Sequence, residues 1–306
     1  MSKTIITMVD NRPPDHSFIR YSAAVAQHYA ERHGYDFRYH IVPPLGADPL
    51  QGCMSVTGNP RHVAWAKLLA IFGLMKQGYE RICYVDTDVM FTDVGRSIEH
   101  FVAKTPLSWG SGNGDVLFLN NKPYGCVDNN DMPCSGVILI SVSEWSRSFL
   151  RSWYELDIPE HDLGHPWEQN ALWEIFRNYP RGIGVLDTWM FRDDKGQWVR
   201  HVPHDQDRER RFVEDFRTHP GLSTGVRASN VSMLDTSEAL QSMASMPRRL
   251  SLLDVALKSR ALRRGLYMCS TLRSRGVVAT VRKRLGLMRQ TIVAQRDGST
   301  AAQEKS

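Results

Sequence analysis

The sequence predicts an α/β fold in which helices cover both faces of a mostly parallel sheet. Short apolar runs rich in β-branched residues alternate with longer segments whose apolar side chains recur at helical spacing. Glycines and prolines separate these segments, as expected for turns between strands and helices. The expected elements are strands over residues 4–9, 36–42 and 82–85, and helices over residues 17–32 and 62–77.

Local signals mark the ends of the first strand and helix. Residues 4–9 run into the loop-forming segment 10–14, and the following helix has Ser17 as its expected N-cap and Gly34 as its stop. Further along, the sequence predicts a loop-rich stretch over 105–135, a strand over 137–142, helices over 144–156 and near 167–178, a strand over 183–188, and a polar segment to about residue 219.

Composition excludes several classes of protein. The 306 residues are 42% hydrophobic, enough for one large domain or two small ones. No run approaches the roughly 18 apolar residues of a membrane-spanning helix, and the N-terminus has no secretory signal pattern. The five cysteines form no C-x-x-C pair, so neither a disulfide framework nor a cysteine zinc site is expected. We therefore expect a cytoplasmic protein.

The formal net charge of +5 is distributed unevenly along the chain. Residues 221–306 hold 15 Lys and Arg but only 5 Asp and Glu, so the first 220 residues are mildly acidic. We expect an α/β domain that holds the functional site over 1–220, a loose connector over 221–247 and a basic helical tail over 248–306.

Residues 274–294 of the tail form an amphipathic pattern with basic side chains and no acidic residue. Such a helix suits the anionic face of a membrane, which would make the protein peripheral on the inner face. The alternative is that the helix packs on the acidic domain or on a second copy of the chain as a homodimer. No nucleic-acid partner is expected, because the tail has no recognition motif and no interleaved aromatic residues.

The candidate chemistry centres on Asp86-Thr87-Asp88, directly after the strand over 82–85. Ligands of open α/β sheets bind at the carboxyl ends of the strands. Two carboxylates one residue apart at that edge can share one hard cation, Mn²⁺ or Mg²⁺. That ion would bridge the phosphates of a nucleotide and neutralise charge on a leaving group. The alternative is a solvated turn in which Asp88 caps a following helix.

Two classes of enzyme place an Asp-x-Asp motif after a strand. Haloacid-dehalogenase-type phosphatases use the first Asp as a nucleophile, usually just after the first strand, whereas here the motif begins at Asp86 and has Met90 at its fifth position. Nucleotide-sugar transferases of the GT-A type place about one βαβαβ unit before the motif. The spacing in this sequence favours the second class.

Five segments in order strengthen that assignment: residues 20–37, Trp65-Ala66-Lys67, residues 84–91, residues 135–153 and residues 167–172. They resemble motifs of the family that contains fungal α-galactosyl- and mannosyltransferases and plant xyloglucan xylosyltransferases. The resemblance implies a GT-A, Rossmann-like fold. Departures are Cys134, where the family usually has Asn, the weak match at residues 200–204, and the absence of the membrane anchor of plant and fungal members.

The resemblance implies a metal site and a nucleotide site. Asp86 and Asp88 would hold Mn²⁺ or Mg²⁺ and through it the diphosphate of a nucleotide-diphosphate sugar. His201 would be the third ligand, on a strand at the far end of the domain, with His204 as the alternative. Lys67 would reach the phosphates unless it is an ordinary surface lysine. Asp86 would also lie near the ribose, and the residues expected at the base-binding edge of the first strand are Thr7, Val9 and Asp10.

The resemblance also implies a retaining glycosyltransferase. Glu168 and Gln169 would lie beside the transferred hexose or pentose, with Gln169 stabilising the oxocarbenium-like state. Trp109, in a glycine-rich loop, would cover a glycan or lipid-linked acceptor. Two alternatives remain open: a non-catalytic protein that binds nucleotide sugars or glycans with the same fold, and the phosphatase described above.

Overall fold

A mixed sheet forms the centre of the computed structural model. In the described part of the chain its strands are β1 (Thr4–Asp10), β2 (Asp36–Ile41), β5 (Arg81–Val85), β7 (Val116–Asn120), β8 (Pro133–Ser141), β9 (Ile183–Leu186) and β11 (Val231–Met233). Their order across the sheet is β11-β2-β1-β5-β8-β7-β9. β8 is antiparallel to both of its neighbours, and the other pairs are parallel. The sheet is therefore mostly parallel, as the sequence predicts.

The structure describes residues 3–103, 115–120, 132–156, 158–178, 182–186, 198–202 and 207–245. The chain divides into a first unit, Met1–Leu253, and a second unit, Asp254–Ser306. The basic tail, the amphipathic pattern over 274–294, Trp109 and His204 lie outside the described residues, so the expectations for them stay predictions. No helix among the described residues is long and apolar enough to cross a membrane.

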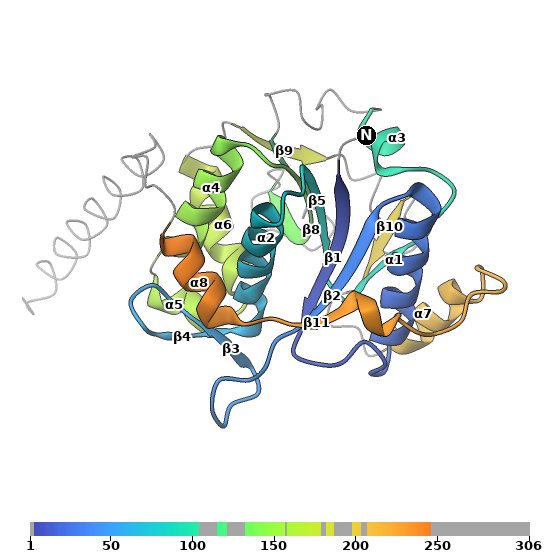
Figure 1. The fold of residues 1–306 in the computed structure, drawn as a ribbon, viewed down its shortest axis with the longest axis horizontal. Helices are drawn as coiled ribbons and strands as arrows, with labels where there is room; N and C mark the ends of the chain where they lie inside the picture. Colours follow the sequence, from blue (N-terminus) through green and yellow to red (C-terminus); the bar gives the residue numbers. More distant parts are fainter. Residues whose placement is uncertain are drawn as a thin grey trace, which may run out of the picture. The chain divides into compact units, whose positions relative to one another are not determined.

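Helices cover both faces of the sheet (Figure 1). Those that are described are α1 (Ile19–His33), α2 (Ala66–Lys76), α3 (Ile98–Val102), α4 (Glu144–Glu155), α5 (Pro159–Asp162), α6 (Glu168–Asn178), α7 (Arg208–Phe216) and α8 (Thr236–Ala244). In Figure 1, α2, α4, α6 and α8 lie on one face, and α1 and α7 on the other. Every residue of β1 is buried, as expected for a central strand covered on both sides.

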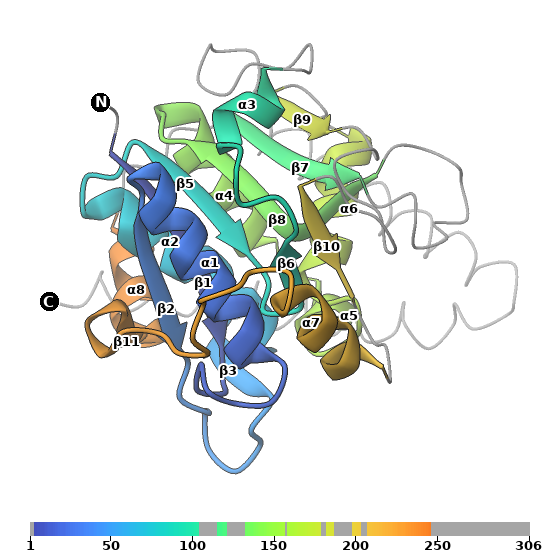
Figure 2. The ribbon, with the colours of Figure 1, turned by 90° about the vertical axis from the view of Figure 1, so that its right-hand side faces the viewer.

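Two short antiparallel pairs flank the carboxyl edge of the main sheet. β3 (Gln51–Met54) pairs with β4 (Pro60–His62), and β6 (Val89–Phe91) pairs with β10 (Val199–His201), as Figure 2 shows for the second pair. A 3₁₀ turn, η1 (Val63–Trp65), leads from β4 into α2. These pairs bring residues distant in sequence to the strand ends.

Only the C-terminal end of α1 matches the prediction. Gly34 adopts the left-handed conformation, φ 70°, and closes the helix with its N–H on the last carbonyls, as predicted. The expected N-cap, Ser17, is wrong: the capping position is Phe18, and the Ser17 hydroxyl instead donates to Glu209 of α7 at 2.9 Å.

Several elements were not predicted. β7 and the start of β8 lie in the stretch expected to be loop, and α7 lies in the segment expected to be merely polar. The strand expected to carry His201 is confirmed as β10. β10 has three residues and pairs with the distant β6, so it leaves no periodic pattern in the sequence, and only the resemblance predicted it.

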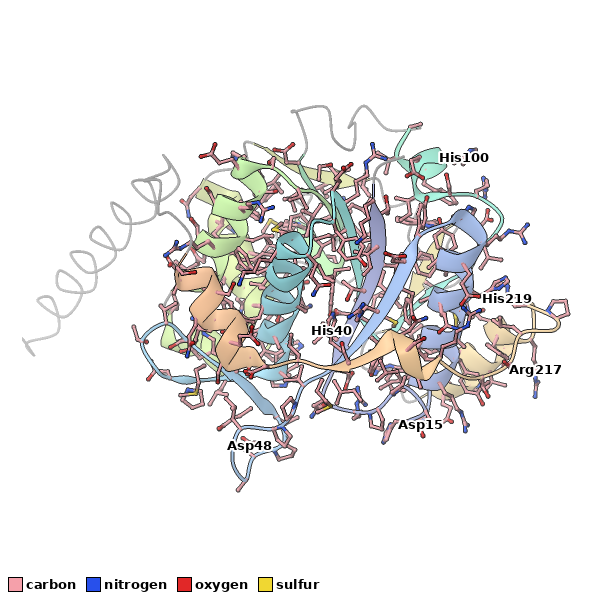
Figure 3. The ribbon with its side chains drawn as sticks, in the orientation of Figure 1. Asp15, His40, Asp48, His100, Arg217 and His219 are labelled. Atoms are coloured by element: carbon pink, nitrogen blue, oxygen red, sulfur yellow. The ribbon has the colours of Figure 1, made fainter. Side chains whose placement is uncertain are left out.

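The prediction of a loose connector over 221–247 is wrong for the described residues 221–245. β11 adds a parallel strand beside β2, and the hydroxyl of Ser232 lies 3.0 Å from Nδ1 of His40, labelled in Figure 3. α8 begins at an N-cap, Asp235, and packs on α2. The sheet-bearing unit therefore extends beyond residue 220.

Candidate functional site

The predicted acidic motif lies at the carboxyl edge of the sheet, in the wall of a cavity of about 940 Å³. β1 and β5 are parallel neighbours, so their carboxyl ends meet there, and Asp10 ends one strand while Asp86 follows the other. The start of α6 and the start of α7 line the same cavity. The fold thus collects residues from four distant parts of the chain around the motif.

Hydrogen bonds hold the Asp86-Thr87-Asp88 turn. The Asp86 N–H donates to the carbonyl of Gly136 on β8 at 2.8 Å, and the Ser22 hydroxyl donates to the carbonyl of Thr87 at 2.6 Å. The Thr87 hydroxyl donates to Asp10 at 2.7 Å. A strand, β6, follows Asp88, so the alternative in which Asp88 caps a following helix is wrong.

The pairing of β10 with β6 places His201 beside the two aspartates. His201 lies opposite Val89, and the N–H of Val202 donates to the carbonyl of Asp88 at 2.9 Å. One ligand atom each of Asp86, Asp88 and His201 lies within 4.8 Å of the others. The structure therefore brings together the three predicted metal ligands.

The donor set fits a divalent cation. Oδ1 of Asp88 is buried and accepts no well-aligned hydrogen bond from the described residues, and it lies 3.1 Å from Nε2 of His201. Burial opposes the ionisation of Asp88, but the neighbouring charge of His201 lowers the pKa of Asp88 to about 2. Burial would lower the pKa of His201, but the Asp88 carboxylate raises it well above its ordinary value. Carboxylate oxygens with one imidazole are ligands that suit Mn²⁺.

Lys67 is buried rather than exposed. Its ammonium lies 2.8 Å from Oε1 of Glu168 and 3.0 Å from Oδ1 of Asp86, and the Tyr84 hydroxyl donates to the same Asp86 oxygen. Burial alone would lower the pKa of Lys67, but the two carboxylates raise it. The surface-lysine alternative is therefore wrong: Lys67 lines the cavity and ties Asp86 to the start of α6.

Glu168 and Gln169 are oriented by Ser135 of β8. The Ser135 N–H donates to Oε1 of Gln169 at 2.9 Å, and its hydroxyl lies 2.9 Å from Oε1 of Glu168. The other carboxylate oxygen of Glu168 is buried without a hydrogen-bond partner among the described residues. Burial raises the pKa of Glu168, and Lys67 opposes that rise. Both residues line the cavity, and Ser135 fixes one side-chain oxygen of each.

The expected base-binding edge is only partly at the cavity. Val9 and Asp10 line it, whereas Thr7 is fully buried within β1 and does not. The Asp10 carboxylate accepts from the Arg12 side chain at 2.8 and 2.9 Å as well as from Thr87. Asp10 thus positions the metal-site turn and Arg12.

Three arginines of the cavity wall, Arg12, Arg177 and Arg208, were not predicted. Arg208 places a guanidinium nitrogen 3.9 Å from Oδ2 of Asp88, and both Arg208 and Arg12 lie over the ring of Phe18, at 4.7 and 5.4 Å. Arg208 belongs to the charged run at the start of α7, where no spacing distinguishes it from its basic neighbours. Arg12 and Arg208 add positive charge beside the carboxylates of Asp10 and Asp88.

Gly136 makes room for His201. A Cβ at Gly136 would lie 2.9 Å from Cε1 of His201 and 3.2 Å from its Nδ1. We therefore expect Gly136→Ala to displace the imidazole, weakening Mn²⁺ binding on the order of tenfold and lowering the free energy of unfolding by about 1–3 kcal/mol. Calorimetric Mn²⁺ titration and urea unfolding measure the two effects.

The matched control is Gly73→Ala, because a Cβ at Gly73 of α2 meets no atom of the described residues within 4 Å. That variant should bind Mn²⁺ like the wild type and be no less stable. Equal Mn²⁺ affinity in both glycine variants would contradict the placement of His201.

No protein-family model and no curated protein matches this sequence. Among solved structures, a glycosyltransferase involved in glycosylation of the major capsid of PBCV-1 aligns at 15% identity and a TM-score of 0.53, over 69% of this chain and 99% of that one. The glycosyltransferase GlyE of Streptococcus pneumoniae TIGR4 aligns at 11% identity and a TM-score of 0.43, over 86% of this chain and 64% of that one.

These identities are too low to show a shared activity, and the likeness to the PBCV-1 enzyme shows a shared fold. The resemblance to the fungal and plant family stays a prediction. What the sheet order and this comparison confirm is the expected GT-A-type α/β fold.

Proposed function

We propose that the protein is a metal-dependent glycosyltransferase that moves a sugar from a nucleotide-diphosphate sugar to a glycan or lipid-linked acceptor, with retention. The observation that supports this most strongly is the cluster of Asp86, Asp88 and His201 at the carboxyl edge of the sheet. It shares one cavity with Glu168 and Gln169. A fold shared with a glycosyltransferase supports the same class.

Asp86, Asp88 and His201 would hold Mn²⁺ or Mg²⁺. When bound, the ion supplies positive charge that neutralises the departing diphosphate. The ion pair with Lys67 holds the Asp86 side chain in position, and Arg208 adds a further positive charge beside Asp88. Asp86 and the first-strand residues Val9 and Asp10 would face the nucleoside.

Glu168 and Gln169 would bind and orient the transferred sugar. One buried oxygen of Glu168 has no hydrogen-bond partner among the described residues and would accept from a sugar hydroxyl. Ser135 holds the carbonyl oxygen of Gln169, whose amide N–H groups would donate to the sugar. In the transfer, the bond from the anomeric carbon to the phosphate oxygen breaks and a bond to the acceptor oxygen forms on the same face. The departing diphosphate takes the acceptor's proton, and Gln169 stabilises the oxocarbenium-like state.

We propose that the transferred sugar is a hexose or a pentose.

The proposal also gives the basic tail a role. Contact of residues 274–294 with an anionic membrane would bring the protein to a lipid-linked acceptor. Sedimentation with anionic vesicles should pull down the full chain and not a variant with the basic residues of 274–294 replaced by glutamine. A homodimer through this segment would instead appear as a doubled mass in solution.

The test is a panel of UDP- and GDP-sugars. A ligand that binds only the folded state raises the melting temperature, so the donor should raise it with Mn²⁺ and much less with EDTA. The same donor should then be hydrolysed in the presence of Mn²⁺, releasing UDP or GDP. Stabilisation without any release of nucleotide would favour the non-catalytic alternative, and hydrolysis of p-nitrophenyl phosphate instead would favour the phosphatase. The ion pair of Asp86 with Lys67 opposes a nucleophilic role for that carboxylate.

A further inference from the structure

Trp167 differs from most of the large aromatic side chains of the domain. Trp65, Trp153 and Trp198 are fully buried. Trp167, directly before Glu168, is half-buried and lines the cavity. His62 and His165 contact the indole ring, and the surface that they leave uncovered lies at the cavity wall, where aromatic side chains commonly contact ligands.

The backbone and the indole of Trp167 are both held in place. Its N–H donates to the carbonyl of Gly164 at 2.7 Å, and its indole N–H donates to the carbonyl of Leu163 at 3.2 Å. Its φ is 49°, in the left-handed region that bulky side chains rarely adopt. Strain of this kind persists where the surroundings impose it and is frequent at ligand sites.

His62 of β4 stacks flat against Trp167. The ring centroids are 3.8 Å apart and the planes differ by 4°. The N–H of Ala64 donates to Nδ1 of His62 at 3.1 Å, which leaves the proton of the neutral ring on Nε2. Burial, helped by the charge of Lys67, lowers the pKa of His62 to about 4, so the ring is uncharged at neutral pH. We name these two residues the aromatic platform.

The chemistry of the aromatic platform suits a neutral sugar ring. The face of an indole is electron-rich and attracts the slightly positive C–H groups on one side of a pyranose. No cationic side chain belongs to the platform, so it offers nothing specific to phosphate. His62 and Trp167 line the same cavity as Glu168 and Gln169, so a sugar on the platform would share that cavity with the pair assigned above to the donor sugar.

We propose that the aromatic platform, His62 and Trp167, is the acceptor subsite and binds a neutral sugar ring by stacking. The assignment to the acceptor rests on the proposed glycosyltransferase function. Binding of a sugar to the platform does not depend on catalysis and is measurable without it.

The experiment measures the binding of methyl glycosides of glucose, galactose, mannose and xylose, and of their β-linked disaccharides, by ligand-observed NMR. The wild type should bind at least one of them at millimolar concentration. Trp167→Ala should bind it at least tenfold more weakly, and Trp167→Phe, which keeps a ring, should bind it with an intermediate affinity. Glycine adopts a positive φ without strain, so Trp167→Gly removes the ring without straining the backbone. The melting temperature of each variant is measured to show that it is folded.

The matched control is Trp145→Ala. Trp145 is also half-buried and stacks on one aromatic ring, Phe149, at 5.2 Å, but it is on α4 and does not line the cavity. That variant should bind the glycoside like the wild type. UDP or GDP binding in Mn²⁺ should stay within twofold of wild type in every variant.

Three results would overturn the proposal: no binding of any glycoside by the wild type, equal binding by Trp167→Ala in its folded state, or loss of UDP or GDP binding in Trp167→Ala, which would make the platform a nucleobase site. Failure of the proposed function gives a different pattern, in which glycosides bind to the platform but no nucleotide sugar is bound or hydrolysed.

Discussion

Asp88→Asn is expected to lower the rate of metal-dependent sugar transfer on the order of a thousandfold. Asparagine keeps the shape of the side chain but removes the charge that a divalent cation needs in its ligand. The fold should survive, because His201, which pairs with Asp88 at 3.1 Å, can lose its proton when the carboxylate is gone. Release of nucleotide from the donor found in the panel measures the rate, and a urea titration measures the stability.

Asp93→Asn is the matched control for that variant. Asp93 follows β6, pairs with Arg96 and does not line the cavity. It should retain the wild-type rate and metal affinity. If Asp88→Asn transferred sugar as fast as Asp93→Asn, the metal role of the acidic motif would be refuted.

Lys67→Met is expected to lower the free energy of unfolding by about 3–5 kcal/mol. The Glu168 carboxylate beside Lys67 is 3% exposed, and removal of its partner leaves a buried charge uncompensated. Most of the loss comes from that charge and only a small part from the lysine itself. Urea unfolding at neutral pH measures the change.

Two further variants sharpen this prediction. Lys76→Met removes an exposed lysine from the same helix and should change the stability by no more than about 0.5 kcal/mol. The double variant Lys67→Met/Glu168→Gln removes both charges and should recover part of the stability lost in Lys67→Met. A Lys67→Met protein as stable as Lys76→Met would show that the buried pair contributes nothing.

Elements with local signals were predicted well. β1, β2 and β5 are apolar runs, and α1 and α2 have helical spacing and, at Gly34, a glycine whose left-handed φ ends the helix. These features depend on residues within a few positions of one another. The GT-A-type fold was therefore accessible from the sequence, together with the strand end that carries Asp86 and Asp88.

Features that depend on distant partners were not predicted from local pattern. β10 is a strand only because it pairs with β6, more than a hundred residues earlier, and that pairing is what places His201. Lys67 was expected to reach the phosphates or to be a surface lysine, but it is buried against Glu168, which lies on α6. β11 is a short edge strand whose partner is β2. The sequence alone therefore identified most of the residues proposed to form the site, but not the contacts that position their side chains.

The most direct test of the central claim is the affinity of UDP and GDP for the wild-type protein with Mn²⁺ and with EDTA, measured by calorimetry. If Asp86, Asp88 and His201 hold a cation that bridges the diphosphate, one of the two nucleotides should bind at least about tenfold more tightly with Mn²⁺, a coupling of about 1.4 kcal/mol. That difference should vanish in Asp88→Asn. An affinity equal in Mn²⁺ and in EDTA would contradict the account.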